Sequence, residues 1–437
     1  MRKRNVLVFP AGTEIGLEIN NALKNCKEVA LYGAGQGIPN HAMFAFPEYH
    51  VLPSIYEDEW LPSLIDLVRD LKIDYIFPAY DDVIVALSQA ANEIPAAVIS
   101  SPVGTCEITR SKSATYRALA GMVRVPHVYD PTDAFFNYPL LVKPDRGQGS
   151  QGVRMARTEE ELHRAMREVT APIVCEYLPG EEFTVDCFSD RERGLLFAGA
   201  RSRRRIRNGI SVNTLTAQLP EVKVIAGIIG RLLNLCGAWF FQLKRASDGE
   251  LVLLEVAPRI AGAMAAHRVT GVNFPLLSIF EHERLDITLM INRGEVELDR
   301  ALSNRYRYEV TFTTAYIDLD DTLIMGGRVN LQAIKFIYQC INQGKTIKLI
   351  TRHQSDLGNT LRKYRLMNLF DDVIHLAQGE PKSSLITERD AIFIDDSFAE
   401  RKDVAHFCGI PTFDGSMLEV LTERAEFVSG ERNDRST

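Results

Sequence analysis

The stretch AYIDLDDTLI, residues 315–324, decides how the last third of the chain is organised. An apolar run leads directly into three carboxylates, Asp318, Asp320 and Asp321, and a threonine. Doubly wound sheets carry their sites at the carboxyl ends of strands. The stretch therefore predicts a buried strand that ends in a site-bearing loop, with about 120 residues of chain still to follow.

Three further polar signals follow at the ends of expected strands: LITR at 349–352, PKSS at 381–384 and FIDDS at 393–397. A carboxylate can attack phosphorus, and a second acid two residues on can protonate the leaving oxygen. A hydroxyl and a lysine can hold phosphoryl oxygens, and further acids can hold Mg²⁺. A lone DxD also fits a solvated loop, but four signals in this order favour a phosphoryl-transfer site.

Residues from about 308 to 420 resemble the haloacid dehalogenase (HAD) superfamily of phosphatases. The resemblance implies a Rossmannoid domain with Asp318 as nucleophile and Asp320 as general acid/base. It also implies that Thr351 and Lys382 bind the phosphoryl group. The implied site for Mg²⁺, or alternatively Mn²⁺, consists of the carboxylates of Asp318, Asp320, Asp395 and Asp396.

The spacing of these motifs limits what can be inserted between them. Only 28 residues separate Thr322 from Thr351, and 30 separate Thr351 from Lys382. These lengths fit one helix, and then a helix with a strand, but not a cap domain. We expect an open site, whose substrate is large or whose missing wall comes from another domain.

A glycine-rich stretch, YPLLVKPDRGQGSQGV at 138–153, carries the second signature. A strand bearing Lys143 is followed by Gly147, Gly149 and Gly152, and no GK[ST] follows, so the stretch is not a Walker loop. Glycines let backbone N–H groups approach phosphate oxygens, while the lysine supplies charge. An inert turn is the alternative interpretation.

The segments that follow favour the phosphate-binding interpretation. IVCEYLPGEEFTVDCF at 173–188 brings Glu182 onto a strand, and WFFQLKRASDGELVLLEVAPRIAG at 239–262 places Gln242 and Glu255 on strands that flank a turn. Those two side chains could reach a common metal across a hairpin. In this order, residues from about 1 to 300 resemble the ATP-grasp superfamily, nearest to its carbamoyl-phosphate-synthetase-like branch.

The ATP-grasp resemblance implies roles for individual residues. Lys112 and Lys143 would contact ATP phosphates, and Arg259 would lie near the transferred phosphate. Gln242 and Glu255 would bind Mg²⁺. The nucleotide would be held by the glycine loop, by the backbone of the adenine-binding segment and by the ribose-binding acid, that is by Gly147, Gly149, Gly152, Glu176, Tyr177, Leu178 and Glu182.

One position departs from the family pattern. The family usually has E-x-N-P-R, whereas this chain has EVAPR, so Ala257 cannot coordinate a second Mg²⁺ through its side chain. This departure puts the catalytic rate in doubt more than ATP binding.

An arginine-rich strand, RSRRRIRNGIS at 201–211, is a candidate substrate-binding element. On an alternating strand Arg201, Arg203, Arg205 and Arg207 share one face, and four such charges repel unless an anion lies there. The favoured interpretation is a carboxylate or phosphate substrate, and the alternative is a solvated strand edge. We expect His267 to be structural.

The whole chain is predicted to be a multidomain α/β and α+β protein. We expect a parallel α/β layer preceding the ATP-grasp fold at 1–105, an α+β ATP-grasp domain at 106–305 and the HAD-like domain at 308–437. Composition is ordinary for a soluble protein, with 46% hydrophobic and 24% charged residues and a net charge of −7. The charge favours neither nucleic acid nor membrane as a partner.

We predict a cytoplasmic protein, because the seven scattered cysteines suit a reducing compartment and no signal peptide or membrane-length apolar run is present. The expected function is bifunctional: a ligase that joins a small-molecule carboxylate to an amine or other nucleophile with ADP release, and a phosphatase acting on a phosphorylated metabolite. The alternatives are a nucleotide-sensing module that regulates the phosphatase, and a small-molecule kinase. The sequence leaves the oligomeric state open, and the resemblance makes a homodimer one of the options, since ATP-grasp relatives are often dimers.

Overall fold

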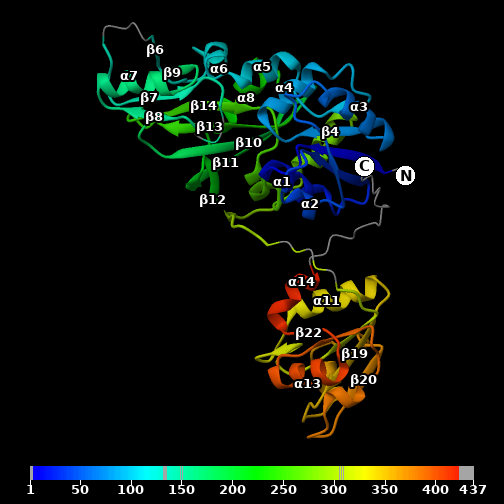
Figure 1. The fold of residues 1–437 in the computed structure, drawn as a ribbon. Helices are drawn as coiled ribbons and strands as arrows, with labels where there is room; N and C mark the ends of the chain where they lie inside the picture. The colour runs from blue at the N-terminus through cyan, green and yellow to red at the C-terminus, as the bar shows by residue number, and fades with distance from the viewer. Residues whose placement is uncertain are drawn as a thin grey trace. The chain divides into compact units, whose positions relative to one another are not determined.

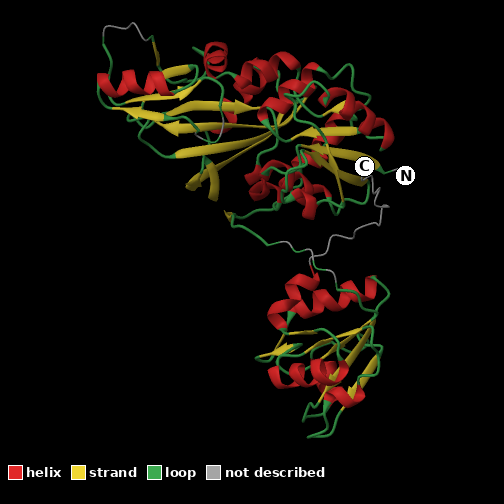
Figure 2. Ribbon diagram, viewed as in Figure 1, coloured by secondary structure: helices red, strands yellow, loops and turns green. Residues whose placement is uncertain are grey.

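A computed structural model of the chain describes residues 3–130, 135–147, 149, 151–304, 306, 308 and 310–422. The chain divides into two compact units, residues 1–303 and 304–437 (Figures 1 and 2). The last part of the predicted third domain, 423–437, lies outside the described residues. The further division of the first unit at 105/106 stays a prediction. No helix among the described residues has the length and apolarity that a membrane crossing requires.

The first unit begins with a five-stranded sheet in the order β3-β2-β1-β4-β5, and every pairing in it is parallel. Strand β1 brings Val6, Leu7 and Val8 into the core with no exposed surface, which explains its continuous apolar sequence. This confirms the predicted parallel α/β layer. The elements are β1 (Arg4–Phe9), α1 (Glu14–Leu23), β2 (Val29–Gly35), α2 (Ala42–Ala45), β3 (Glu48–Val51), α3 (Trp60–Asp70), β4 (Tyr75–Pro78), α4 (Asp81–Gln89), β5 (Ala97–Val98) and α5 (Val103–Arg110).

Two antiparallel sheets follow in the same unit and form the predicted α+β block. One has the order β6-β9-β7-β8, and the other has the order β14-β13-β10-β11-β12-β15. The first contains β6 (Val128–Tyr129), β7 (Leu140–Pro144), β8 (Arg154–Ala156) and β9 (Pro172–Glu176). The second contains β10 (Glu182–Asp190), β11 (Gly194–Arg207), β12 (Ile210–Ala217), β13 (Gly237–Arg245), β14 (Leu251–Ala257) and β15 (Glu297–Asp299). The helices are α6 (Lys112–Leu119), α7 (Glu159–Glu168), α8 (Val222–Leu232), η1 (Gly262–Met264), α9 (Ala265–Arg268) and α10 (Phe274–His282).

The second unit contains a parallel sheet in the order β20-β19-β16-β21-β22, with a short hairpin beside it. Its strands are β16 (Thr314–Ile317), β17 (Ile324–Met325), β18 (Arg328–Val329), β19 (Thr346–Thr351), β20 (Asp372–His375), β21 (Ala391–Ile394) and β22 (Thr412–Phe413). Its helices are α11 (Leu331–Asn342), α12 (Leu357–Lys363), η2 (Lys382–Leu385), α13 (Phe398–Cys408), η3 (Gly415–Met417) and α14 (Leu418–Thr422). Strand β16 is central and fully buried, as the apolar run before Asp318 predicts.

The elements between the four motifs agree with the prediction that the spacings are too short for a cap domain. A hairpin, β17 and β18, and one helix, α11, lie between Thr322 and Thr351; the hairpin was not predicted. Helix α12 and strand β20 lie between Thr351 and Lys382. Within the fully described segment 310–422, no additional domain is inserted at either position.

Candidate functional sites

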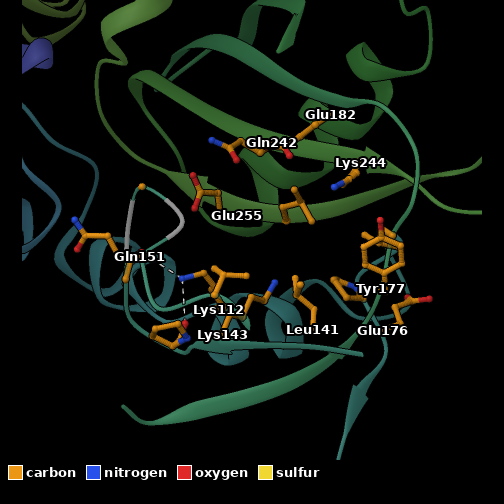
Figure 3. Close-up of a pocket in the computed structure, with 17 residues that line it drawn as sticks. Lys112, Leu141, Lys143, Gln151, Glu176, Tyr177, Glu182, Gln242, Lys244 and Glu255 are labelled. Atoms are coloured by element: carbon orange, nitrogen blue, oxygen red, sulfur yellow. Dashed lines mark hydrogen bonds between the residues drawn. The ribbon is translucent and has the colours of Figure 1, made fainter. Parts of the chain in front are cut away.

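The first candidate site is a pocket of about 220 Å³ between the two antiparallel sheets of the first unit. Figure 3 shows its side chains, with Lys112 and Lys143 at one end and Glu176 and Tyr177 at the other. The nucleotide-site residues that the sequence predicted and that line it are Lys112, Lys143, Gly147, Gly149, Glu176, Tyr177, Leu178, Glu182, Gln242 and Glu255. Gly152 does not line the pocket; it follows the loop with a φ of +73°, a conformation that favours glycine.

Gln242 and Glu255 face the pocket as a directly opposed cross-strand pair of β13 and β14. Opposed residues of an antiparallel pair lie on the same side of the sheet, about 5 Å apart at Cβ. The two side chains thus lie across the hairpin from each other as expected, and their shared cation stays a prediction. Burial raises the pKa of the Glu255 carboxyl, so a bound cation would favour its charged form.

The two predicted lysines approach the same space from different elements. Lys143, on β7, is only 5% exposed, and its Nζ donates to the Tyr116 hydroxyl at 2.9 Å. Lys112, at the start of α6, donates to the carbonyls of Pro144 and Gly147 at 3.3 and 3.2 Å. Burial lowers the pKa of both lysines, which marks them as cations held in a poorly solvated site.

Arg259 lines a smaller neighbouring pocket together with Lys112, Gly147 and Glu255. Its guanidinium pairs with the Asp81 carboxylate and lies over the Phe240 ring, 5.0 Å from the centroid. Arg259 therefore lies beside Glu255 and already has a carboxylate partner, while its place near a transferred phosphate stays a prediction. Sequence reasoning did not assign a role to Asp81, although an acid three residues after the end of parallel strand β4 is a recognisable signal.

Lys244 is a second residue that sequence reasoning missed. It lines the pocket and lies opposite Glu182 on β10. Since it follows Gln242 by two positions on one strand, side-chain alternation could have found it.

The arginine strand corrects one prediction. Arg203 pairs with Thr214 across β11 and β12, but Arg205 pairs with Asn213, so the register shifts between them. Because adjacent residues of β12 face opposite sides, Arg203 and Arg205 do not share a face, and the prediction of four arginines on one face is wrong.

Three arginines in the C-terminal half of β11 have carboxylate partners inside the protein. Arg201 is 3% exposed and donates to both carboxylate oxygens of the fully buried Asp186, at 2.9 and 3.1 Å. Arg203 and Arg205 pair with Glu182 and Asp299, each at 2.8 Å. The repulsion that suggested a bound anion is therefore already balanced, while Arg207 is exposed.

His267 has the structural place that the sequence predicted. It is buried, and its Nδ1 lies 2.9 Å from Oδ2 of Asp186. Burial acts to raise the pKa of Asp186, but the Arg201 charge and the two hydrogen-bonding partners outweigh it, so the net pKa is lowered. Asp186, Arg201 and His267 thus form a buried ionic cluster within the first unit.

The second candidate site lies at the carboxyl edge of the parallel sheet in the second unit. Asp318 directly follows β16, Thr351 ends β19, Asp395 directly follows β21, and Lys382 begins η2. Lys382 Nζ lies 2.6 Å from Oδ1 of Asp318 and 2.6 Å from Oδ2 of Asp395. All four side chains are less than 9% exposed, so the predicted motifs converge in one buried cluster.

Burial raises the pKa of Asp318 to about 7, with Lys382 opposing the shift. Burial alone would lower the pKa of Lys382, but the carboxylates of Asp318 and Asp395 outweigh it and raise the pKa. A carboxyl group with a perturbed pKa beside a fixed cation is typical of a catalytic site.

Three carboxylates, those of Asp318, Asp395 and Asp396, offer oxygens that lie within 4.8 Å of one another. Such an all-oxygen donor set suits a hard cation such as Mg²⁺ or Mn²⁺. The prediction that the Asp320 side chain belongs to this set is wrong, because Asp320 points to His353, whose Nδ1 lies 2.9 Å from Oδ1. Asp321 adopts a left-handed conformation, with φ +56°, and serves the turn after the strand.

His353 was missed by sequence reasoning. Its Nδ1 contacts Asp320, and its Nε2 lies 2.8 Å from the Thr360 hydroxyl on α12, so both ring nitrogens are engaged. The ring is 13% exposed, whereas Asp320 is 52% exposed and open to solvent. A histidine two residues after Thr351 at a strand end is the signal that could have identified it.

Comparisons with known proteins agree with the geometry of the first unit, and together they support its assignment to the ATP-grasp superfamily. Residues 168–292 match the family model described as ATP-grasp in the biosynthetic pathway with Ter operon. A 90-residue segment is 28% identical to D-alanine–D-alanine ligase of Fusobacterium nucleatum, covering 20% of this chain and 31% of that protein. A 91-residue segment is 34% identical to D-alanine–D-alanine ligase of Thermotoga maritima, covering 19% of this chain and 30% of that protein. The chain thus spans about a third of the length of these curated relatives.

Solved structures extend the likeness of fold. The biotin carboxylase domain dimer of the Hydrogenobacter thermophilus 2-oxoglutarate carboxylase, in complex with MgADP, ADP and bicarbonate, has a TM-score of 0.57 at 17% identity, covering 68% of this chain and 74% of that one. An L-amino acid ligase from Bacillus licheniformis has a TM-score of 0.52 at 20% identity, covering 64% and 74%. The ADP complex of N5-carboxyaminoimidazole synthetase from Staphylococcus aureus has a TM-score of 0.55 at 14% identity, covering 67% and 81%.

Proposed function

We propose that the chain is a bifunctional enzyme, in which an ATP-dependent ligase of the ATP-grasp superfamily is joined to a HAD-like, metal-dependent phosphatase. The opposed pair Gln242 and Glu255, in one pocket with the buried Lys143 and the half-buried Lys112, carries the ligase part. The buried cluster of Asp318, Lys382 and Asp395 carries the phosphatase part. Assignment to the carbamoyl-phosphate-synthetase-like branch is part of the same proposal.

In the ligase part, ATP would lie along the 220 Å³ pocket with adenine near Glu176 to Leu178 and phosphates near Lys112 and Lys143. Structures of the same fold contain ADP and, in one case, magnesium, which supports ATP and Mg²⁺ as cofactors. Gln242 and Glu255 would hold Mg²⁺, which when bound offsets phosphate charge.

The ligase reaction would proceed in two steps. A substrate carboxylate oxygen attacks the terminal phosphorus of ATP, the bond to ADP breaks, and an acyl phosphate forms. An amine or other nucleophile then attacks the acyl carbon and displaces phosphate. Lys112 and Lys143 would balance charge on the transferred group, while Arg259 would orient it.

In the phosphatase part, Asp318 would attack the substrate phosphorus and form an aspartyl-phosphate. Asp320 would give a proton to the leaving oxygen and later take one from the water that releases phosphate. Lys382 and Thr351 would hold phosphoryl oxygens. Asp318, Asp395 and Asp396 would hold Mg²⁺ or Mn²⁺, which lowers the repulsion between carboxylate and phosphate when bound.

Ala257 favours a second candidate function. Because its methyl group offers no ligand, the first unit could bind nucleotide without turnover and regulate the phosphatase. A third candidate, a small-molecule kinase, would form ADP and a phosphorylated product without condensation.

The deciding experiment uses Asp318→Asn, which silences the phosphatase and preserves ligase products that carry phosphate. The full-length variant is incubated with ATP, Mg²⁺ and a small-metabolite extract, and ADP and new masses are followed. A condensed product that retains phosphate, and loses it when wild type is added, would support the ligase followed by the phosphatase. A phosphorylated product without condensation would indicate the kinase, and absence of ADP across repeated extracts would contradict the ligase.

A further inference from the structure

A second large cavity, of about 450 Å³, lies in the first unit and is separate from the nucleotide pocket. Its lining comes from the ends of β1 and β2 and the loops that follow them, from Tyr49 on β3, from residues 53–56 after β3, and from the start of α4. In the sheet order β3-β2-β1-β4-β5, strands β2 and β3 are added on one side of β1, and β4 and β5 on its other side. The order in which strands are added therefore reverses between β1 and β4. Open α/β sheets bind ligands at the carboxyl ends of strands at such a reversal, so the cavity occupies the expected place for a ligand.

The lining of this cavity is aromatic and uncharged. Phe9, Tyr49, Tyr56 and Tyr80 contribute rings, and no Asp, Glu, Lys, Arg or His is among the residues that form it, all of which the structure describes. The nucleotide pocket differs sharply, because three lysines and three glutamates line it. The cavity is therefore unsuited to a phosphate and suited to the flat faces of an uncharged ring.

Hydrogen bonds fix the walls of the cavity before any ligand arrives. The Tyr49 hydroxyl donates to the Gln36 carbonyl at 3.1 Å and accepts from the Asn40 amide at 3.0 Å. The Tyr56 hydroxyl donates to Oδ2 of Asp82 at 2.9 Å, although 77% of Tyr56 is exposed. A ring entering the cavity thus meets positioned aromatic faces, which reduces the ordering required on binding.

Two polar groups in the lining remain available to a ligand. Neither the Gln36 side-chain amide nor the Tyr80 hydroxyl makes a hydrogen bond to another described residue. A ring with a hydrogen-bonding group on its edge would engage them, whereas a purely aliphatic ligand would leave them unmet.

The cavity adjoins the proposed ligase site through consecutive residues. Tyr80 lines the cavity, while the next residue, Asp81, lines the pocket that contains Lys112, Glu255 and Arg259. Arg110, which pairs with Asp82 at 2.7 Å, lines that same pocket. A molecule with its ring in the cavity could therefore extend a second group toward the proposed ligase site.

We propose that this cavity binds an uncharged aromatic or heteroaromatic ring with a hydrogen-bonding edge, and that the ring belongs to the ligase substrate. The second half of this statement rests on the proposed function, whereas ring binding itself does not require ATP turnover.

The test uses the full-length protein with indole as the probe, in excess MgADP so that the nucleotide pocket is filled. Saturation-transfer NMR and titration should show indole binding with a dissociation constant of roughly millimolar or tighter, as the size of the probe permits. Cyclohexylmethanol, which has no aromatic face, should bind at least about threefold more weakly. Equal binding of the two would overturn the proposal, and so would absence of indole binding both with and without MgADP.

Tyr56→Ala is the discriminating variant, because a ring that is mostly exposed can be removed without loss of folding. It should weaken indole binding about threefold to tenfold. Tyr338→Ala, which removes an exposed tyrosine of α11 in the second unit, is the matched control and should change nothing. Unchanged binding in Tyr56→Ala would contradict the assignment.

The outcomes separate this inference from the proposed function. Indole binding without ADP formation from any extract would keep the ring site and reject the ligase. ADP formation that is equal in wild type and Tyr56→Ala would keep the ligase and reject the cavity as its substrate site.

Discussion

Lys382 joins Asp318 to Asp395: its Nζ lies 2.6 Å from a carboxylate oxygen of each, in a cluster that is almost closed to solvent. We expect Asp318→Asn to lower phosphatase activity by at least about a thousandfold, because an amide cannot act as the nucleophile. Hydrolysis of p-nitrophenyl phosphate measures the effect. Asp390→Asn, at an exposed aspartate of the same unit, should retain activity; activity retained by Asp318→Asn would refute the nucleophile assignment.

His353 holds the Asp320 carboxylate, and we expect this contact to position the acid for the leaving group. His353→Phe should slow hydrolysis of an alkyl phosphate by about tenfold or more, because alkoxide departure needs a proton. p-Nitrophenyl phosphate, whose leaving group departs without one, should be affected less than about threefold. Equal losses on both substrates would indicate a merely structural role. His406→Phe, on the exposed side of α13, is the control.

Lys143 is buried in the lining of the nucleotide pocket, and its charge is one that a bound phosphate would neutralise. Lys143→Met should weaken MgADP binding by about tenfold to a hundredfold, the usual worth of a hydrogen bond to a charged group. Titration calorimetry on the full chain measures this. Lys223→Met, at an exposed lysine of α8, should bind MgADP like wild type, and a Lys143→Met protein that did the same would contradict the assigned phosphate contact.

The buried Asp186–Arg201 pair should dominate the electrostatic contribution to stability in the first unit. Asp186→Asn leaves the Arg201 guanidinium buried without its counter-charge and should lower the free energy of unfolding by about 3–5 kcal/mol. Asp299→Asn removes the partner of the exposed Arg205 and should cost about 1 kcal/mol or less. Tryptophan fluorescence during urea unfolding reports on this unit, since both tryptophans, Trp60 and Trp239, belong to it. Equal costs would contradict the assignment.

Glu388 connects two central strands of the second unit, since it accepts from Lys348 on β19 at 2.7 Å and from the Tyr316 hydroxyl on β16. These partners, led by Lys348, lower the pKa of the Glu388 carboxyl from 4.5 to about 2. Because the pKa of Glu388 is lower in the folded than in the unfolded protein, its ionised carboxylate stabilises the folded state. This contribution is fully present above pH 4.5 and is lost as the pH falls toward 2.

Glu388→Gln should therefore exchange amide hydrogens in β16 and β19 faster than wild type at pH 7. Hydrogen–deuterium exchange of the two proteins at pH 7, 5 and 3 should show the difference shrinking at the lowest pH. If the difference in exchange between Glu388→Gln and wild type instead grew as the pH fell, the assigned role of the Glu388 carboxylate would be contradicted. Asp372→Asn, at an exposed acid of β20, is the control.

The sequence by itself determined where the polar groups of both sites fall along the chain. Apolar runs fix the strands, and parallel strands bring their carboxyl ends to one edge, so Asp318, Thr351 and Asp395 converge as expected. A hairpin with a short connection likewise set Gln242 opposite Glu255. These inferences succeeded because periodicity and short connections are local properties.

Only the tertiary structure decided the details that depend on register and on distant partners. The register shift between β11 and β12 puts Arg203 and Arg205 on opposite faces of the sheet, and no residue pattern within the strand predicts this shift. The pairing of Asp320 with His353 and that of Arg201 with Asp186 bring together side chains from different strands and loops. Strand alternation is set within a segment, whereas register and packing are set by the other segments that meet it, so the sequence determined the elements and the fold determined their partners.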